Sequence, residues 1–565
     1  MVCKISCSLG KATVSEINVA IFCIIKKEEI VLRRPWCFLL CLLLAFSMFL
    51  PAGWVGAGSE EIPPPQPMGN VISNQLPPPS EDTTPGTWFL GATPANADPN
   101  KLPIVFVQGM NGKAQNWWSE TNYHGLNDMY ETAYNHGYRT AFVQLYDAGG
   151  KPSSQWDNGE LLARMLKEIY DHFGQKVNIV AHSKGGPDTQ AALIHYGAYP
   201  YVSKVVTLGS PHHGSHLADL AHSSWAGWLA ELLGQRSDAT YSLQTGEMAK
   251  YREQTDSHPD ADKNVYYTAA GTNWGPSLSA LWFGGFYLSS HGDNDGLVNV
   301  WSTELPYGNH LFTKDVDHDA IRTGSVAFAE IDSVLRSGQV VQTRLDVPRM
   351  TEESADHFVR GGPLTAGTQA EETIPVDAGS EEILFTVLTK SPEVEVRLTS
   401  PSGKVYTETS GVFSQATDET FFQGAAVQMF HLKGSQVESG NWTMQMNSPQ
   451  TDAYLLITTY SGTDTLSFTF PAKADSGRLP LQMNWKNTDL KQLQGSIQVI
   501  SPRGEKIQTE KITAGQIRKN VPDLADRFGL KEPGTYNVTI DLQGTKADGT
   551  PFARTIIRSV YIGKQ

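Results

Sequence analysis

The sequence predicts an α/β domain with a mostly parallel sheet flanked by helices, followed by two small all-β sandwich domains. Three observations support this prediction. Apolar strands alternate with helical segments over residues 87–338, a pattern typical of a parallel sheet covered on both faces. Beyond about residue 340 the pattern changes to short alternating strands separated by Gly, Pro and Ser turns. The length of 565 residues also favours several domains over one core.

Residues 1–57 are interpreted as a leader and signal peptide. Arg33 and Arg34 precede an uninterrupted apolar run from Trp36 to Leu50, and small residues end at Ala57. A charged segment, an apolar segment and a small-residue site in this order are typical of a secretory signal. All five cysteines lie within the first 41 residues, so a chain cleaved near Ala57 would have no disulfide. We therefore expect secretion from a bacterial cell after cleavage near Ala57.

Residues 58–86 are rich in Pro, Ser and Glu and lack periodicity, so we expect an extended linker there. The catalytic α/β domain is expected over 87–338, with an amphipathic helix at Leu161–Phe173. Its candidate strands are Ile104–Gln108, Arg139–Leu145, Val177–Ala181, Lys204–Gly209 and Val265–Ala270.

A weak internal repeat divides the C-terminal part. A strand ending in S-P-x-G occurs at 396–404 and again at 497–505, and an E-x-G-x-aromatic motif occurs at 438–446 and at 532–540. The repeat predicts a β-sandwich over 339–463 and an Ig-like β-sandwich over 464–565. A single irregular β-domain is the alternative.

The most informative stretch is Ala181-His182-Ser183-Lys184-Gly185. It follows a β-branched run, Val177 to Val180, and precedes a helix-like segment, Pro187 to Tyr196. A sharp turn between strand and helix exposes a serine hydroxyl at the edge of a sheet, where an imidazole can reach it. Ser183 is therefore the candidate nucleophile.

A hydroxyl nucleophile needs a base, and the base needs an orienting acid. Asp295, in a Gly-Asp-Asn-Asp-Gly turn at 292–296, and then His318, at the end of a short apolar segment, follow Ser183 in the chain. This order of serine, acid and histidine suits a serine hydrolase. Asp293 lies on the same turn as Asp295, so either carboxylate can be the orienting acid.

These residues resemble a known family. The motifs A-H-S-x-G, L-G-S-P-H-H-G, N-D-G-L-V and a late D-H are similar to those of the secreted bacterial triacylglycerol lipases and esterases of the α/β-hydrolase superfamily. The resemblance covers about 100–336 and implies an α/β-hydrolase fold, with Ser183 as nucleophile, Asp295 as acid and His318 as base. It also implies that the backbone N–H groups of Met110 and Lys184 bind the oxyanion. The family usually has His-Gly where this chain has Gln108-Gly109.

Four tryptophans are candidates for the substrate pocket. Trp117 and Trp118 follow the oxyanion segment, whereas Trp225 and Trp228 lie in a helical insertion at about 212–290. The insertion is interpreted as a lid that contacts lipid transiently. An ordinary packed helix is the alternative.

Two clusters suggest metals, although the chemistry needs no cofactor. His212, His213 and His216, with Asp219 nearby, have zinc-like spacing. Asp315, Asp317 and Asp319 resemble the start of a calcium loop without its glycine and distal glutamate. Solvent-facing or structural roles are the alternatives for both clusters, and no metal ligand is assigned.

We predict a serine hydrolase acting on carboxylic esters, most readily a triacylglycerol lipase or carboxylesterase. One alternative is an extracellular polyhydroxyalkanoate depolymerase, and another is an adhesion protein with a vestigial hydrolase domain. The net charge of −15 argues against nucleic acid as a partner. The C-terminal domains are expected to bind cell wall or substrate, or to act as spacers.

Overall fold

The computed structural model describes most of the chain beyond residue 61. The predicted leader, signal peptide and cleavage near Ala57 lie outside the described residues. Where the chain is described, no helix combines the length and the apolar character needed to cross a membrane. The described ranges are 62–73, 83–233, 237–336, 352–463, 465–474, 478–486, 490–518 and 523–563.

An eight-stranded sheet forms the centre of the catalytic domain, in the order β1-β2-β4-β3-β5-β6-β7-β8. The strands from β4 to β8 in this order are parallel, and β1 and β2 are antiparallel. This mostly parallel sheet confirms the predicted α/β-hydrolase fold. The strands are β1 (Gln66–Asn70), β2 (Thr87–Leu90), β3 (Ile104–Val107), β4 (Thr140–Val143), β5 (Val177–His182), β6 (Val202–Leu208), β7 (Val265–Gly271) and β8 (Gly308–Lys314).

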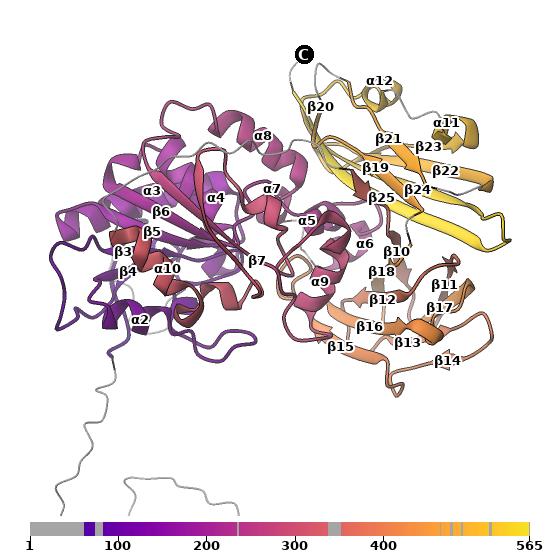
Figure 1. Ribbon diagram of the computed structural model, residues 1–565, viewed down its shortest axis with the longest axis horizontal. Coiled ribbons are helices and arrows are strands. Elements are labelled where there is room, and N and C mark those ends of the chain that lie inside the picture. Colours follow the sequence, from indigo (N-terminus) through magenta and orange to yellow (C-terminus); the bar gives the residue numbers. More distant parts are fainter. Residues whose placement is uncertain are drawn as a thin grey trace, which may run out of the picture. The chain divides into compact units, whose positions relative to one another are not determined.

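Alternate residues of the central strands pack in two separate cores, one on each face of the sheet. Val105 and Ile179 pack with α3 (Gln155–Phe173) on one face, whereas Phe106 and Val180 pack with α2 (Met129–Asn135) and α10 (Gly324–Arg336) on the other. Strands buried on both faces read as continuous apolar runs, which is why they were predictable. Figure 1 shows α3 and α10 on opposite sides of the sheet.

Two predicted boundaries need correction. The expected linker at 58–86 contains β1, which pairs with β2 at the edge of the main sheet; an edge strand needs few apolar residues and tolerates the neighbouring prolines. The expected insertion at about 212–290 is interrupted by β7 of the sheet. Helices precede and follow that strand: α5 (His216–Ala221), α6 (Gly227–Leu233), α7 (Asp238–Ser242), α8 (Thr245–Thr255) and α9 (Ala280–Leu288).

The C-terminal part forms two pairs of sheets, as expected for β-sandwiches. The first sandwich packs sheet β10-β18-β12-β16-β15 on sheet β11-β17-β13-β14, and the second packs β20-β25-β24-β22-β23 on β21-β19-β9. All pairs are antiparallel except β20 with β25. The strands of the first sandwich are β10 (His357–Leu364), β11 (Gln369–Val376), β12 (Glu382–Thr389), β13 (Glu395–Thr399), β14 (Val405–Tyr406), β15 (Phe413–Thr417), β16 (Ala426–Lys433), β17 (Gly440–Asn447) and β18 (Asp452–Ser461).

The second sandwich includes a strand that precedes the first one in the chain. Strand β9 (Glu353–Ser354) lies within the range predicted for the first sandwich but pairs with β19 of the second. Two short helices, α11 (Ala514–Arg518) and α12 (Leu524–Phe528), complete this sandwich. Its other strands are β19 (Leu466–Thr469), β20 (Lys473–Ala474), β21 (Gln482–Trp485), β22 (Lys491–Ile500), β23 (Lys506–Thr513), β24 (Gly534–Thr545) and β25 (Pro551–Ile562).

The repeated motifs occupy equivalent positions in the two sandwiches. Each S-P-x-G segment is a turn closed by the serine N–H, which donates to Lys404 O in one case and to Glu505 O in the other, both at 2.8 Å. In the second motif the aromatic side chain, Trp442 or Tyr536, donates to the carbonyl of the glutamate four residues earlier, also at 2.8 Å. The two units therefore share local hydrogen bonding as well as sequence.

The helices of the predicted lid pack on the first sandwich. Leu217, Leu229 and Phe283 share one core with Val359 and Ile457 of that sandwich. The apolar face of these helices is therefore covered in the full chain, as the packed-helix alternative requires.

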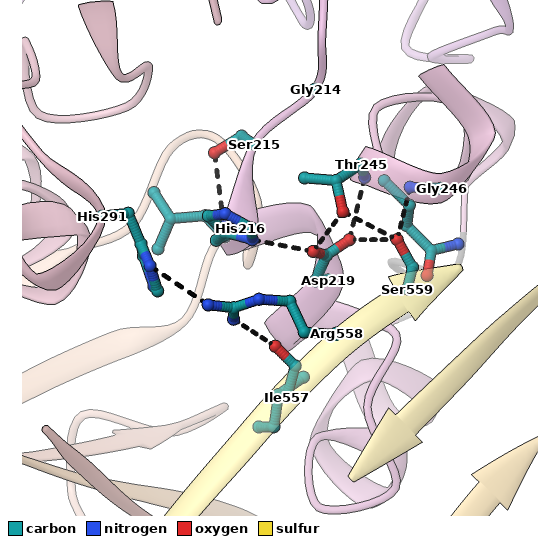
Figure 2. Close-up of polar contacts among 12 residues, drawn as sticks. Gly214, Ser215, His216, Asp219, Thr245, Gly246, His291, Ile557, Arg558 and Ser559 are labelled. Carbon is teal, nitrogen blue, oxygen red and sulfur yellow. Dashed lines mark hydrogen bonds and ion pairs between the residues drawn. The ribbon is translucent and has the colours of Figure 1, made fainter. Parts of the chain in front are cut away.

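A second contact joins α5 and α8 to β25 through polar groups (Figure 2). The buried carboxylate of Asp219 accepts hydrogen bonds from Ser559 Oγ at 2.5 Å, Thr245 N at 2.9 Å and Thr245 Oγ1 at 2.8 Å. Ser559 Oγ also accepts from Gly246 N at 2.7 Å. This contact fixes β25 against the N-terminus of α8.

Candidate functional site

Ser183 lies in the sharp turn between β5 and α4 (Gly185–Gln190). Its φ is +53°, a conformation that costs energy for a residue with a Cβ and that is often found at functional sites. The turn needs close backbone approaches. A Cβ at Gly109 would lie 2.7 Å from Ser183 Cβ, and one at Gly185 would lie 2.5 Å from Gln108 O. The sequence therefore raises the serine side chain above the carboxyl end of the sheet.

Asp295 and His318 form a buried hydrogen-bonded pair. His318 Nδ1 and Asp295 Oδ2 are 2.8 Å apart, and the His318 N–H donates to Asp295 O at 2.9 Å. The other carboxylate oxygen of Asp295 accepts from Val298 N at 2.8 Å and Leu297 N at 3.1 Å. Asp293, the alternative acid, is exposed. The pair leaves His318 Nε2 as the nitrogen that can act on a neighbour.

Ser183 and His318 line the same cavity, which has a volume of about 440 Å³. Gln108, Met110 and Trp117 form part of its wall on the catalytic domain. Another part of the wall comes from the first sandwich, at the end of β15 and in the segment between β15 and β16: Thr417, Asp418, Glu419, Thr420, Gln423 and Gly424.

Hydrogen bonds hold this segment of the first sandwich at the cavity. Asn122 Nδ2 donates to Glu419 Oε2 at 2.7 Å, and Asn111 Nδ2 donates to Thr420 O at 3.3 Å. Asp418 Oδ1 accepts from the N–H of Thr420 at 2.8 Å and so shapes the segment itself. In the full chain the sandwich therefore covers one side of the cavity that contains Ser183.

Met110 and Lys184, the predicted oxyanion donors, lie on either side of Ser183. Met110 lines the cavity, and Lys184 is the residue before the first turn of α4. The Gln108 side chain points elsewhere. In the amide orientation that satisfies both groups, Gln108 Nε2 donates to Val143 O at 2.7 Å and its Oε1 accepts from Leu145 N at 2.8 Å. Gln108 therefore joins β3 to β4, and its side chain is not a donor to the cavity.

His182, which the sequence analysis left without a role, contacts the histidine of the pair. Its Nε2 lies 2.8 Å from His318 O, and the two imidazole rings are 4.7 Å apart. Burial and the neighbouring His318 and Arg322 hold the pKa of His182 well below its usual value. A neutral His182 can therefore donate one N–H to the His318 carbonyl and fix that loop. The sequence signal for a role of His182 is its position directly before Ser183. Strand periodicity alone predicts only a packing role for this side chain.

Three of the four tryptophans predicted for the pocket lie elsewhere. Trp117 lines the cavity, but Trp118 packs edge-on against Phe142 in the core under the sheet. Trp225 stacks with Arg360 of the first sandwich, and Trp228 is 54% exposed. Neighbouring residues on a short helical turn point in different directions, so proximity to Met110 in the sequence did not place Trp118 in the pocket.

The zinc-like spacing does not bring its histidines together. His212 bonds with Gln190 and Thr207, His213 with Glu304 O, and His216 with Asp219. Because each imidazole has a different protein partner, the predicted set is not a shared ligand site.

The predicted calcium carboxylates also have separate partners. Asp315 accepts from Asn273 at 2.9 Å, Asp317 pairs with His124 at 2.7 Å, and Asp319 pairs with Arg322 at 2.6 Å. These oxygens face donors of the protein and do not converge on one point.

One other group of side chains has metal-like geometry. The ligand atoms of His216, His291 and Glu353 lie within 4.8 Å of one another. Arg558 already lies among them: it pairs with Glu353, and its Nη2 is 3.3 Å from His291 Nδ1. The guanidinium therefore supplies the positive charge at this position (Figure 2).

No family model matches the chain. The chain is similar to the Bacillus licheniformis lipase BlEst2 crystallised in its propeptide form, with 37% identity, 85% of this chain and 98% of that chain covered, and a TM-score of 0.70. The mature form of that lipase has 50% identity over 45% of this chain and 99% of its own, with a TM-score of 0.41. The chain therefore belongs to the lipases and esterases of the α/β-hydrolase superfamily, enzymes that hydrolyse carboxylic esters.

Proposed function

We propose that this protein is a secreted triacylglycerol lipase or carboxylesterase with a Ser183-Asp295-His318 triad. One observation carries the proposal: His318 is bonded through Nδ1 to the buried Asp295 at 2.8 Å and shares a cavity with Ser183, whose strained backbone presents its hydroxyl. Secretion is supported by the apolar run near the N-terminus.

The first half of the reaction transfers the acyl group to the enzyme. His318 Nε2 takes the proton of Ser183 Oγ while the oxygen attacks the ester carbonyl carbon, and the carbonyl oxygen becomes an oxyanion. The N–H groups of Met110 and Lys184 donate to that oxyanion. The imidazolium then gives its proton to the departing alkoxide, which leaves as the alcohol, and the acyl-serine remains.

Water completes the cycle. His318 Nε2 removes a proton from water as the water oxygen attacks the acyl carbon, and the second tetrahedral intermediate releases Ser183 Oγ, which recovers the proton. Asp295 holds Nδ1–H throughout, so the imidazole keeps the tautomer with a basic Nε2. Two backbone N–H groups bind its other oxygen and so fix the orientation of the carboxylate.

Substitution of the nucleophile tests the proposal directly. Ser183→Ala is expected to lower kcat for p-nitrophenyl butyrate by about 10,000-fold or more and to leave the melting temperature close to that of the wild type. A fluorophosphonate probe should label the wild type once, at Ser183. Unchanged turnover in the variant would contradict the triad, and an unlabelled wild type would favour a binding protein with a vestigial hydrolase domain.

Substrate class needs a separate comparison. Hydrolysis of tributyrin, of long-chain triglycerides and of a polyhydroxyalkanoate film by the same preparation separates a lipase or carboxylesterase from a polyester depolymerase. We expect triglyceride hydrolysis to dominate; clearing of the film without triglyceride hydrolysis would favour the depolymerase.

The full chain also has the features of a proenzyme. The segment between β15 and β16 supplies one wall of the cavity and is bonded to Asn111 and Asn122 of the catalytic domain. The similar Bacillus licheniformis lipase was crystallised in a propeptide form. We therefore expect limited proteolysis that removes both sandwiches to increase the rate of triglyceride hydrolysis. A rate of triglyceride hydrolysis that falls as the fraction of cleaved protein rises would show that the sandwiches support activity instead.

A further inference from the structure

A buried group of charged side chains includes that of Lys184, whose N–H is one of the proposed oxyanion donors. The Lys184 side chain is 0% exposed, and those of Asp147 and Asp188 are each 2% exposed. Burying charges costs several kcal/mol per ion unless good geometry compensates. Stability alone is therefore a weak reason for this group, which lies next to the nucleophile.

The contacts within the group are specific. Lys184 Nζ lies 2.9 Å from Asp188 Oδ1, 3.1 Å from Asp188 Oδ2 and 3.9 Å from Asp147 Oδ2. Asn158 Nδ2, from α3, donates to Asp147 Oδ2 at 2.6 Å and to Asp188 Oδ2 at 2.9 Å. Asn158 thus clamps both carboxylates around the ammonium group.

Asp147 also reaches the segment that carries the other proposed oxyanion donor. Its Oδ1 accepts the N–H of Asn111 at 3.2 Å, and Asn111 has a φ of +57°. This hydrogen bond fixes the peptide that joins Met110 to Asn111. One carboxylate therefore contacts the backbone just after Met110 with one oxygen and faces the Lys184 ammonium with the other.

We propose that Asp147 is a positioning residue that sets the distance between the Met110 and Lys184 N–H groups, acting with the Lys184 side chain and Asn158. The inference rests on the proposed function, because it assumes those two donors. Oxyanion donors stabilise the transition state only when they lie close to 3 Å from the developing charge. A misplacement of about 1 Å can lower a rate by about 100-fold.

The environment of Asp188 reflects both its burial and its charged neighbours. Burial raises the pKa of Asp188 to about 7, and the nearby Asp147 adds to the rise, although Lys184 and Asn158 oppose it. Asp188 follows Lys184 by four residues, whereas Asp147 contacts both Lys184 and Asn111 and therefore links the two segments.

Asp147→Asn tests the inference. Asparagine presents its NH₂ group either to Lys184 and Asn158 or to the N–H of Asn111, all of them donors, so one side of the link is lost in either orientation while the side-chain volume is kept. We expect kcat per active site, counted by fluorophosphonate titration, to fall by about 100-fold with KM changed by less than about threefold. The affinity for an alkylboronic acid, which forms a tetrahedral anion on Ser183, should fall by the same factor as kcat. Inhibition by 1-butanol, a neutral alcohol without an anionic oxygen, should not change.

Asp332→Asn is the matched control. Asp332 is a buried carboxylate bonded to Tyr138 OH at 2.7 Å in the core of the catalytic domain. This variant should lose stability but keep kcat per active site and boronate affinity. If Asp147→Asn does not fold, Asn158→Ala, which changes no charge, carries the same test.

The outcomes separate this inference from the proposed function. Wild-type turnover by Ser183→Ala would overturn the proposed function. An inactive Ser183→Ala together with an Asp147→Asn variant of unchanged kcat per active site and unchanged boronate affinity would overturn only the role of Asp147.

Discussion

At the scale of single residues, Asp293 and Asp295 show that one of two neighbouring carboxylates is buried against His318 and the other is not. Both lie on one turn, and the sequence offered either as the acid. In the structure Asp295 is buried and bonded to His318, whereas Asp293 is exposed. Only a carboxylate bonded to Nδ1 can select the tautomer whose Nε2 accepts the serine proton.

The two aspartates therefore form a matched pair of variants. Asp295→Asn is expected to lower kcat by about 10,000-fold, since asparagine favours the wrong imidazole tautomer. Asp293→Asn should retain kcat within about twofold, because a solvated turn carboxylate contributes little. Steady-state kinetics with p-nitrophenyl butyrate compare the two. Equal losses in both variants would mean that the turn as a whole, and not the Asp295 contact, is required.

Much of the site was predictable at this scale, because motif order reflects the fixed order of strands in this fold. Ser183 and His318 were assigned to the edge of the sheet and do line one cavity. The orientation of side chains was not predictable. Trp117 and Trp118 are adjacent in sequence and pack in the same core, yet of the two only Trp117 also borders the cavity. Lys184 contacts Asp188, four residues later in the chain, and Asp147, from the segment after β4. No local pattern connects Asp147 to Lys184.

At the scale of elements, α8 approaches β25 so closely at Gly246 that a side chain at this position would collide with the strand. A Cβ at Gly246 would lie 2.7 Å from Val560 N and 2.8 Å from Val560 C. Both atoms belong to the backbone of a central strand of the second sandwich, so they cannot move aside easily. The absence of a side chain at Gly246 is therefore a condition of the contact.

Gly246→Ala should weaken this contact by about 1–3 kcal/mol, the usual range for overpacking. Gly515→Ala is the control, because it lies in the short helix α11 with open space around its Cβ position, and alanine there should be neutral or slightly stabilising. Hydrogen exchange of β25 peptides measures the effect. Equal protection in both variants would show that the contact tolerates a methyl group.

Elements buried on both faces were the easiest to predict. Strands β3 and β5 are fully buried, and their apolar runs stand out. Strand β8 has only two buried residues among partly buried and exposed ones, and β1 lies at an edge with one buried residue. Such strands bury too little apolar surface to be distinguished from loops, since their pairing depends on neighbours far away in the sequence.

At the scale of the whole molecule, buried histidines connect acidity to the contact between the catalytic domain and the sandwiches. His291 faces Glu353 and Arg558 of the second sandwich and His216 of α5, the last at 4.1 Å between rings. Burial, His216 and Arg558 lower the pKa of His291 to about 3. The neutral form is therefore the one that fits this contact.

Acid should therefore weaken the contact. Because the pKa of His291 is lower in the contact than when the ring is free, the stabilisation is complete above the free value of about 6.5 and is lost as the pH falls from there towards 3. The loss is about 1.4 kcal/mol per pH unit for one such group. The difference in melting temperature between the wild type and His291→Gln should thus shrink between pH 7 and pH 5. His136→Gln, which alters an exposed histidine outside this contact, is the control variant. A difference between the wild type and His291→Gln that stays constant with pH would contradict the prediction.

The pairing of β9 with β19 has a consequence for how the chain is made. Synthesis runs from the N-terminus, so β9 leaves the ribosome before any strand of the first sandwich, whereas β19 follows all of them. Strand β9 therefore has no β19 to pair with until the whole first sandwich has been synthesised. Because β9 has only two residues, it exposes few unpaired backbone N–H and C=O groups during this time, and a neighbouring nascent chain has little edge to pair with.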